Sequence, residues 1–269
     1  MTNNQAYRTF AESLVQMGGE VALKNYRAKR FGTEWKADHT YVTQTDTEIE
    51  RTMREMIRGK FPDHAVFGEE YGGDLDEETP TWILDPLDGT TNFAHRLPLF
   101  CSMAALQIGG KIVASAVSYP IEDQLISAAE NGGATVNGAP FPSASTQQQL
   151  DSVTLLLDSG KSEQARADSF RFLADHGPQF RSFRKFGCMI APLIFAIQGK
   201  LDVVIIFGVD LYDVAGLSLI FSEAGYVIMD AAGNPWQKSS NGDFVISSQA
   251  LQPKLKSLFQ TKANKDSDE

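Results

Sequence analysis

The sequence predicts a mixed fold class, α+β in its N-terminal half and α/β in its C-terminal half. Between positions 100 and 136, short apolar stretches alternate with turn signals rich in glycine and asparagine, as is typical of an antiparallel meander. Beyond position 150, apolar strands alternate with helical patterns, which indicates an α/β arrangement. A polar stretch at 143–149 separates the two patterns. We therefore expect an N-terminal half at 1–142, a C-terminal half at 150–260 and a flexible tail at 261–269.

The first element is a predicted amphipathic helix at residues 6–26. Gly18 and Gly19 weaken it, because a glycine inside a helix costs about 1 kcal/mol relative to alanine. We interpret its apolar face as core. The residues that recur there at helical spacing are Phe10, Leu14, Met17 and Val21.

A second helix is predicted to follow, and Thr45 and Glu48 have the spacing of a capping box at its start. Asp46 would then lie in the first helical turn, where a carboxylate complements the helix dipole. That structural role is a sufficient explanation for Asp46 when the helix is considered alone. The apolar side of this helix consists of Ile49, Met53, Met56 and Ile57.

A short strand is predicted at 65–67, and the string Gly68-Glu69-Glu70 ends it. Adjacent glutamates are most often solvated surface charge. The acidic segment 74–79 reads as a turn-like link without a chemical role.

The segment 82–93 reads Trp-Ile-Leu-Asp-Pro-Leu-Asp-Gly-Thr-Thr-Asn-Phe. Its apolar start predicts the end of a buried strand, and Pro86 is expected to stop the ladder because proline has no N–H group. Asp88 follows Asp85 by three residues, and Gly89 allows the backbone to turn before a helix start at Thr90.

Two interpretations of this bend compete. Asp, Pro and Gly are the common turn residues, so Asp-Pro-x-Asp-Gly by itself favours a surface turn. In the other interpretation, Asp85 and Asp88 bind a hard cation such as Mg²⁺, and the free amides of the helix start bind phosphate. Together these features indicate metal-assisted phosphate chemistry.

In the C-terminal half, Asp213 lies in the string Asp-Leu-Tyr-Asp-Val-Ala-Gly at 210–216 and would open a helix. Taken alone, it could simply be an N-terminal cap, a common role for aspartate. Pro192 is expected to interrupt another helix near its start. The remaining elements expected here are a strand at 153–157, a helix at 162–176, that interrupted helix at 189–198 and a strand at 203–207.

Composition excludes several classes of protein. A formal charge of −10 argues against nonspecific nucleic-acid binding, which rests on basic surface. The four histidines form no pair with zinc-ligand spacing, and no phosphate-binding loop or nucleophile elbow is present. No apolar run of about 18 residues predicts a membrane span, and the first residues do not resemble a signal peptide. Cys101 and Cys188 lie in apolar surroundings and are expected as buried thiols, so a cytoplasmic protein is the expectation.

Three strings together resemble the inositol monophosphatase superfamily, whose members are Mg²⁺-dependent, lithium-sensitive phosphatases. They are Gly68-Glu-Glu, the string at 82–93 and the string at 210–216, followed by Glu223-Ala-Gly. The match to the central string has no gap, whereas Tyr212 stands where the family usually has tryptophan. The resemblance covers about residues 10–250 and implies a layered α-β-α-β-α sandwich of the inositol monophosphatase/fructose bisphosphatase type, commonly dimeric.

The resemblance also implies roles for these residues with two or three Mg²⁺ ions. Glu69, Asp85 and the Leu87 carbonyl would hold one ion, and Asp85, Asp88 and Asp213 would hold another. Gly89 and Thr90 would offer amides to phosphate. Thr90, with Asp46 or Glu69, would orient the attacking water, and lithium would inhibit.

The substrate is left open by the sequence. In the family, an acidic residue commonly binds the substrate, and Ile206 occupies the matching position here. Asp210 is the candidate to replace it. The string from Lys36 to Thr43 resembles the histidinol-phosphatase branch, whereas the string from Asn92 to His95 resembles the inositol branch. The leading interpretation is a phosphatase like inositol monophosphatase. The alternatives are a histidinol-phosphate phosphatase or a sugar bisphosphatase.

A family member that has become a binding or scaffold protein is the non-enzyme alternative. Such a protein would typically lose a ligand from a costly cluster of carboxylates. This chain keeps all of them, which favours an active enzyme with a small phosphorylated metabolite as partner. The candidate residues present are Asp46, Glu69, Asp85, Asp88, Thr90 and Asp213.

Overall fold

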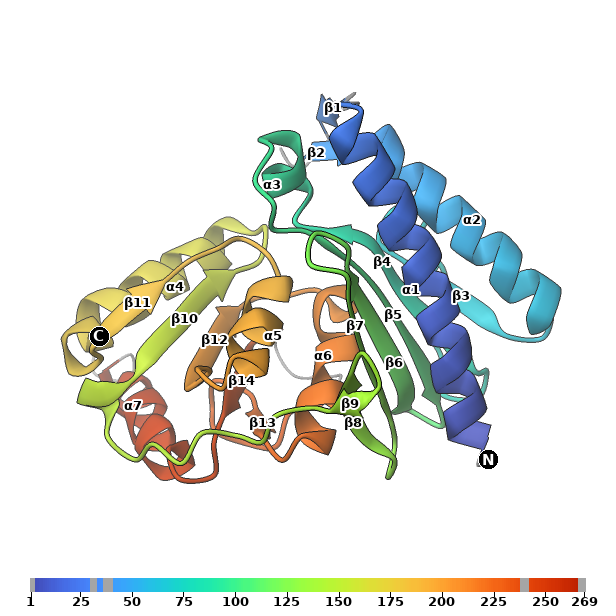
Figure 1. The fold of residues 1–269 in the computed structure, drawn as a ribbon. Coiled ribbons are helices and arrows are strands. Elements are labelled where there is room, and N and C mark those ends of the chain that lie inside the picture. The colour runs from blue at the N-terminus through green and yellow to red at the C-terminus, as the bar shows by residue number, and fades with distance from the viewer. Residues whose placement is uncertain (1–2, 30–32, 36–40, 238–241, 266–269) are drawn as a thin grey trace. The chain divides into compact units, whose positions relative to one another are not determined.

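The computed structural model describes residues 3–29, 33–35, 41–237 and 242–265, which form two compact units (Figure 1). The first unit comprises Met1–Phe141, Gly187–Ala191 and Leu211–Glu223, and the second comprises the rest. The units therefore differ from the two contiguous halves expected from the sequence, because the segment with Asp213 belongs to the first unit. Most of the string at 36–43 that resembles the histidinol-phosphatase branch lies outside the described residues.

A seven-stranded sheet forms the centre of the first unit, in the order β3-β4-β5-β6-β7-β8-β9. Strands β3 and β4 are parallel, and every other neighbouring pair is antiparallel. The run from β5 to β9 confirms the predicted meander. The strands are β3 (Ala65–Gly68), β4 (Thr81–Asp88), β5 (Cys101–Ile108), β6 (Lys111–Tyr119), β7 (Gln124–Ala129), β8 (Gly133–Val136) and β9 (Ala139–Pro140).

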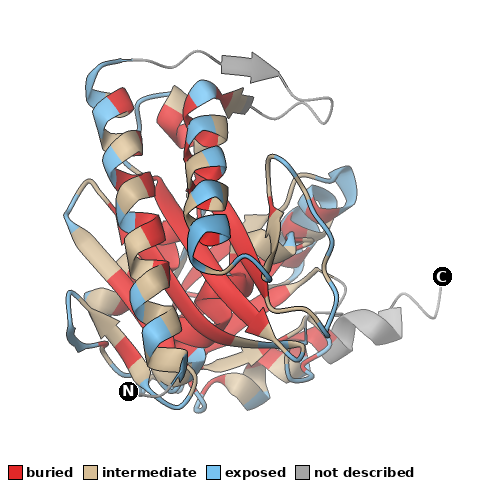
Figure 2. Ribbon diagram, turned by 90° about the vertical axis from the view of Figure 1, so that its right-hand side faces the viewer, coloured by how far each residue is buried: buried red, intermediate tan, exposed pale blue. Residues whose placement is uncertain are grey.

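Helices cover both faces of this sheet. On one face, α1 (Asn3–Arg27) and α2 (Gln44–Lys60) pack over strands that Figure 2 shows as almost entirely buried. On the other face lies α6 (Leu211–Glu223). Side chains of β4 alternate between the two faces, since Trp82 and Leu84 join the core under α1 and α2 while Ile83 packs with Ala215.

The glycine pair in α1 is explained by close packing on the sheet. A Cβ atom on Gly18 would lie 2.3 Å from Oγ of Ser102, and one on Gly19 would lie 2.4 Å from Oγ of Ser118. The helix tolerates its two poorest helix formers because only glycine lets the backbone come this near to β5 and β6.

Two local predictions were wrong in detail. The capping box of α2 is formed by Thr43 and Asp46, not by Thr45 and Glu48. Strand β4 does not stop at Pro86 but continues to Asp88 through a register shift. Proline is tolerated there because a bulge leaves one residue out of the ladder.

A two-stranded antiparallel pair, β1 (Thr33–Trp35) and β2 (Tyr41–Thr43), precedes α2.

The second unit contains a five-stranded sheet in the order β11-β10-β12-β14-β13. The first three strands are parallel, β14 pairs antiparallel with β12, and β13 pairs antiparallel with β14 at the edge of the sheet. The predicted alternation of strands and helices is confirmed. The elements are β10 (Thr154–Ser159), α4 (Glu163–His176), β11 (Ser182–Arg184), α5 (Ile190–Ile197, which begins in the first unit), β12 (Val203–Phe207), β13 (Val227–Met229), β14 (Phe244–Ser247) and α7 (Gln252–Lys265), with short 3₁₀ turns at Leu150–Ser152 and Gly177–Gln179.

Two further expectations need correction. Pro192 does not interrupt α5, because it lies in the first turn, where a missing N–H group breaks no helical hydrogen bond. Helix α7 continues to Lys265, so it includes five residues of the segment expected to be a flexible tail.

Cys101 and Cys188 are buried free thiols, as predicted. Within the described parts of the chain, none of the helices has the length and apolar character needed to cross a membrane.

Candidate active site

The first unit contains every residue expected to bind metal or phosphate. Asp46 lies in the first turn of α2, Glu69 directly follows β3, and Asp213 lies in the first turn of α6. The others lie on β4 or at the start of α3 (Thr90–Ala94), and they are Asp85, Leu87, Asp88, Gly89 and Thr90.

The bulge in β4 places the two aspartates on the same face of the sheet. Asp85 pairs with Met103 of β5, and Asp88 pairs with Cys101, so three steps on β4 oppose two steps on β5. In a regular strand, residues three apart point to opposite faces, but the extra residue restores the same side. Side chains of β4 alternate, so Asp85 shares the face of Ile83, which packs against α6. Helix α6 carries Asp213 in its first turn, over that same face.

Asp88 is a buried carboxyl held by backbone amides. Its Oδ2 atom accepts hydrogen bonds from the amides of Met189 at 2.7 Å and Ile190 at 3.3 Å, and from Sγ of Cys101 at 3.4 Å. Burial raises the pKa of Asp88 to about 7, and the charge of Glu69 acts in the same direction, against the lowering effect of these donors. Ionising Asp88 is therefore harder in the folded protein than in water.

Asp46 is linked to Thr90 and to its own helix cap. Its Oδ2 accepts from the backbone amide of Thr43 at 2.9 Å and from the Thr43 hydroxyl, while its Oδ1 accepts from Oγ1 of Thr90 at 2.9 Å. The pKa of Asp46 is raised to about 6, mainly by burial, with a smaller contribution from the charge of Glu69. Hydrogen bonds from both threonines oppose that shift. The capping role is therefore real, and the contact with Thr90 is an additional one.

Thr90 has a second acceptor. Its hydroxyl oxygen is also 2.9 Å from the carbonyl oxygen of Leu87, the carbonyl expected to face a cation. Gly89 precedes Thr90 with φ +79°, and a Cβ atom there would lie 2.6 Å from the carbonyl oxygen of Leu99. Both the left-handed backbone and the close approach require glycine, and they set the direction in which the chain enters α3.

The donor types at this site fit a magnesium ion. Carboxylates and a backbone carbonyl are the hard oxygen ligands that Mg²⁺ prefers. Asp85 and Asp88 are only 1% and 7% exposed, and the charge of Glu69 raises the pKa of Asp88, so Glu69 and Asp88 repel each other when both are ionised. Among the described residues, no group of three or more His, Cys, Asp or Glu side chains already has the arrangement of a metal site.

The residues suggested for substrate binding belong to the second unit. Ile206 lies in β12, whose five residues are all buried, and is 1% exposed. Asp210 is exposed between β12 and α6. Their role in substrate choice stays a prediction.

Sequence reasoning missed several partners of the predicted residues. Thr43 could have been found, because it precedes Asp46 by the three residues of a capping box. Met189 and Ile190 could not, since they bind Asp88 across about 100 residues of chain and use only backbone groups.

Comparisons with known proteins show which family and which solved structures this chain is similar to. A model of the inositol monophosphatase family matches residues 3–264. The chain is 32% identical over 234 residues to the inositol monophosphatase of Dictyostelium discoideum, covering 84% of this chain and 85% of that protein. It is 30% identical over 230 residues to the Nus factor SuhB of Salmonella typhimurium (strain LT2), covering 84% and 85%. The solved structure of a Thermotoga maritima IMPase superposes with a TM-score of 0.82 at 23% identity, covering 96% and 98%.

Proposed function

The chain belongs to the inositol monophosphatase family, and from this premise we propose that it hydrolyses a small phosphate monoester with the help of Mg²⁺. One observation carries the proposal. The bulge in β4 places Asp85 and Asp88 on one face of the sheet. The charge of Glu69, which acts on both Asp88 and Asp46, supports this observation. The mixed fold expected from the sequence is also confirmed as that of the family's solved structures.

We assign the metal ligands as the sequence suggested: Glu69, Asp85, the Leu87 carbonyl, Asp88 and Asp213. When bound, Mg²⁺ supplies positive charge that offsets the phosphate oxygens and the developing alkoxide, and it makes a coordinated water more acidic. The chain's own contribution is to gather hard donors on one bulged strand and to keep them out of bulk water.

Thr90 and Asp46 handle the proton of the attacking water in this proposal. If the Thr90 hydroxyl donates to Asp46, its oxygen is free to accept a hydrogen bond from water and so to orient it. Asp46, with its pKa raised to about 6, is a better proton acceptor than an ordinary aspartate. The reaction needs no covalent phosphoenzyme, because water rather than a side chain attacks phosphorus.

Two amides complete the proposed substrate site. The backbone N–H groups of Gly89 and Thr90 open α3 and would donate to phosphate oxygens. The inositol monophosphate class is the leading substrate, with histidinol phosphate and sugar bisphosphates as alternatives. Ile206 is buried and cannot accept a hydrogen bond from a polyol, so we expect only a modest preference for inositol phosphate.

A phosphate-release screen tests this function. The protein would be assayed with inositol, histidinol, sugar and nucleotide phosphates, with Mg²⁺ or with a chelator. We expect activity that requires Mg²⁺, disappears with the chelator and falls on adding lithium. Purified, folded protein without activity on any phosphate class would favour the binding or scaffold alternative. One 30% identical relative is the Nus factor SuhB, which makes that alternative worth testing.

A further inference from the structure

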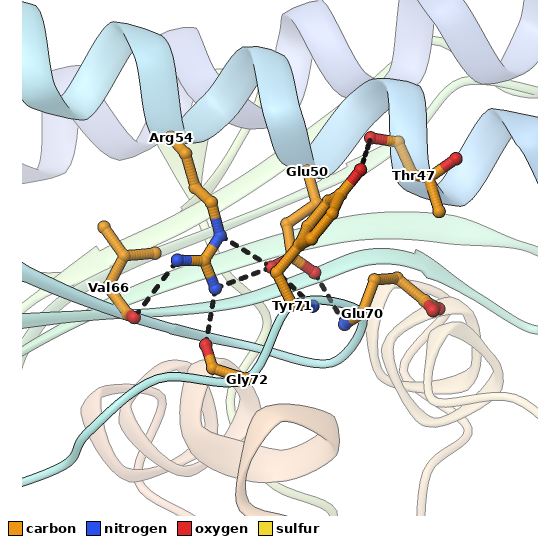
Figure 3. A network of polar contacts seen from close by, with 7 residues as sticks. All are labelled: Thr47, Glu50, Arg54, Val66, Glu70, Tyr71 and Gly72. Carbon is orange, nitrogen blue, oxygen red and sulfur yellow. Dashed lines mark hydrogen bonds and ion pairs between the residues drawn. The ribbon is translucent and has the colours of Figure 1, made fainter.

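A buried carboxylate outside the proposed metal ligands holds the turn that carries Glu69. Glu50 lies on α2, one helical turn after Asp46, and is 0% exposed. Its Oε2 accepts a hydrogen bond from the amide of Glu70 at 2.7 Å, and its Oε1 accepts from the amide of Tyr71 at 3.3 Å (Figure 3). The two amides that follow Glu69 are therefore both bound to one side chain.

Arg54, on the next turn of α2, holds the far end of the same turn. Its Nε and Nη2 atoms each lie 2.8 Å from Oε1 of Glu50. Its Nη2 also donates to the carbonyl of Gly72, and its Nη1 donates to the carbonyl of Val66 at 3.4 Å. The guanidinium thus links α2 to β3 and to the residue that closes the turn.

Hydrogen bonds on the other side of the turn leave Glu69 little freedom. The amides and carbonyls of Gly68 and Gly72 bond each other at 3.0 Å, and the amide of Glu69 donates to the carbonyl of Leu84 on β4 at 3.2 Å. A Cβ atom on Gly68 would lie 2.1 Å from Oε1 of Glu50, so the close approach of Glu50 requires a glycine there. The backbone of Glu69 is thereby held between β4 and Glu50.

Stability alone is a weak reason for this arrangement. A buried ion pair gains little over well-packed apolar residues, because removing both charges from water is costly. A carboxylate that bonds two successive amides does what an apolar side chain cannot, since it sets the direction of the backbone. Groups that orient a metal ligand without contacting the metal commonly change the affinity of the site for that metal.

We propose that Glu50 is a positioning residue that, with Arg54 as its counter-ion, fixes the Glu69 carboxylate for cation binding. The proposal rests on the function proposed above and assigns Glu50 no contact with substrate or metal. It places the device on α2, the helix that also carries Asp46, so that one rigid element positions both the water-handling carboxylate and the turn of Glu69.

The first experiment is a calorimetric titration of Mg²⁺ into the substrate-free protein. Glu50→Gln keeps the size of the side chain but turns one acceptor into a donor, so the amides and Arg54 cannot all be satisfied. We expect Mg²⁺ to bind about 10- to 100-fold more weakly. In activity assays the Mg²⁺ needed for half-maximal rate should rise similarly, while KM at saturating Mg²⁺ changes little.

Glu12→Gln is the matched control. Glu12 is a partly buried glutamate on α1 whose Oε1 binds Oγ of Ser127 at 2.6 Å and Nε of Arg8 at 3.3 Å. The same chemical change there should leave Mg²⁺ affinity as in the parent protein. An equal loss of Mg²⁺ affinity in Glu12→Gln and Glu50→Gln would overturn the positioning role, because a general loosening would then explain both.

A double-variant cycle asks whether Glu50 acts through Glu69. In a Glu69→Gln background the ligand is already lost, so adding Glu50→Gln should weaken Mg²⁺ binding by less than about twofold. A full additional loss would contradict the proposal. If Glu50→Gln does not fold, Glu50→Asp serves instead, because it keeps the charge near Arg54 but is too short to reach both amides.

The outcomes separate this proposal from the proposed function. A parent protein that binds no Mg²⁺ and releases no phosphate would overturn both. A parent protein that is Mg²⁺-dependent, together with a folded Glu50→Gln variant of unchanged Mg²⁺ affinity, would overturn only the role of Glu50.

Discussion

The hydroxyl of Thr90 has one hydrogen and two acceptors, Oδ1 of Asp46 and the carbonyl of Leu87, each at 2.9 Å. Whichever acceptor takes the hydrogen, the oxygen keeps a lone pair that can accept from a water molecule. At the scale of single residues, this hydroxyl is the most specific part of the account, because a threonine needed only for packing would not require it.

Thr90→Ala should therefore reduce kcat by about 100-fold or more while changing KM much less, since general acid–base help is worth that much in the transition state. Steady-state kinetics at saturating Mg²⁺ measure both constants. Thr90→Ser is the control, because it keeps the hydroxyl and should retain most of the rate. A raised KM with unchanged kcat would make Thr90 only a substrate contact.

Most candidate site residues could be proposed from the sequence because they lie in short strings. Asp85 and Asp88 are three residues apart, and Glu69 follows a recognisable strand. The partners of these residues were harder to predict. The amide of Met189 donates to Asp88 from a distant part of the chain, and the residue spacing around Asp88 does not predict that contact.

At the scale of elements, β4 departs from the rule that proline ends a central strand, and the departure helps to form the candidate site. Pro86 should end a central strand, yet β4 continues between β3 and β5. The bulge accommodates the proline and also changes which face Asp88 occupies. Sequence patterns specify strand and turn propensities but not this one-residue change of register, which depends on how β5 pairs.

The contact of α1 with the sheet gives a second test at this scale. Gly18→Ala would place its Cβ 2.3 Å from Oγ of Ser102, so we expect a loss of about 1–3 kcal/mol in the free energy of unfolding. Gly59→Ala is the control, because nothing lies within 4 Å of a Cβ atom at that position in α2. It should be neutral or stabilising by up to about 1 kcal/mol. Urea unfolding of both variants measures the difference, and a stabilised Gly18→Ala would contradict the close packing.

At the scale of the whole molecule, the buried carboxyls make stability depend on pH and metal. The pKa of Asp46 is raised from 3.8 to about 6, and that of Asp88 is raised from 3.8 to about 7. From the lower value to the raised value of each group, the folded state binds more protons than the unfolded state. Stability then falls as pH rises through this window, because ionisation is harder in the folded protein. Mg²⁺ favours the ionised carboxylates and should oppose the loss.

Melting temperatures measured in a chelator and in Mg²⁺ test this linkage. Between about pH 5 and about pH 8 we expect the chelated protein to lose stability and the stabilisation by Mg²⁺ to grow. In Asp88→Asn, the part of the pH dependence that belongs to Asp88 should be absent. Equal melting temperatures with and without Mg²⁺ at the upper end of this range would contradict cation binding at these carboxyls.

Much of the fold could be predicted from periodicity, including the meander of the first unit and the alternation of strands and helices in the second. The assignment of α6 to the first unit could not. Its residues from Val214 to Phe221 are all buried, so no polar face indicates which sheet it covers. Only long-range packing decides that, and it is what brings Asp213 to the face of Asp85 and Asp88.

The central claim is that Asp85, on the bulge of β4, serves Mg²⁺-dependent phosphate hydrolysis. The most direct measurement is phosphate release from inositol monophosphate by the parent protein and by Asp85→Asn, each with Mg²⁺ and with a chelator. We predict Mg²⁺-dependent turnover by the parent protein and nearly none by a folded Asp85→Asn variant, whose melting temperature in chelator is equal or higher because a repelling charge is gone. A folded Asp85→Asn variant with turnover close to that of the parent protein would contradict the claim.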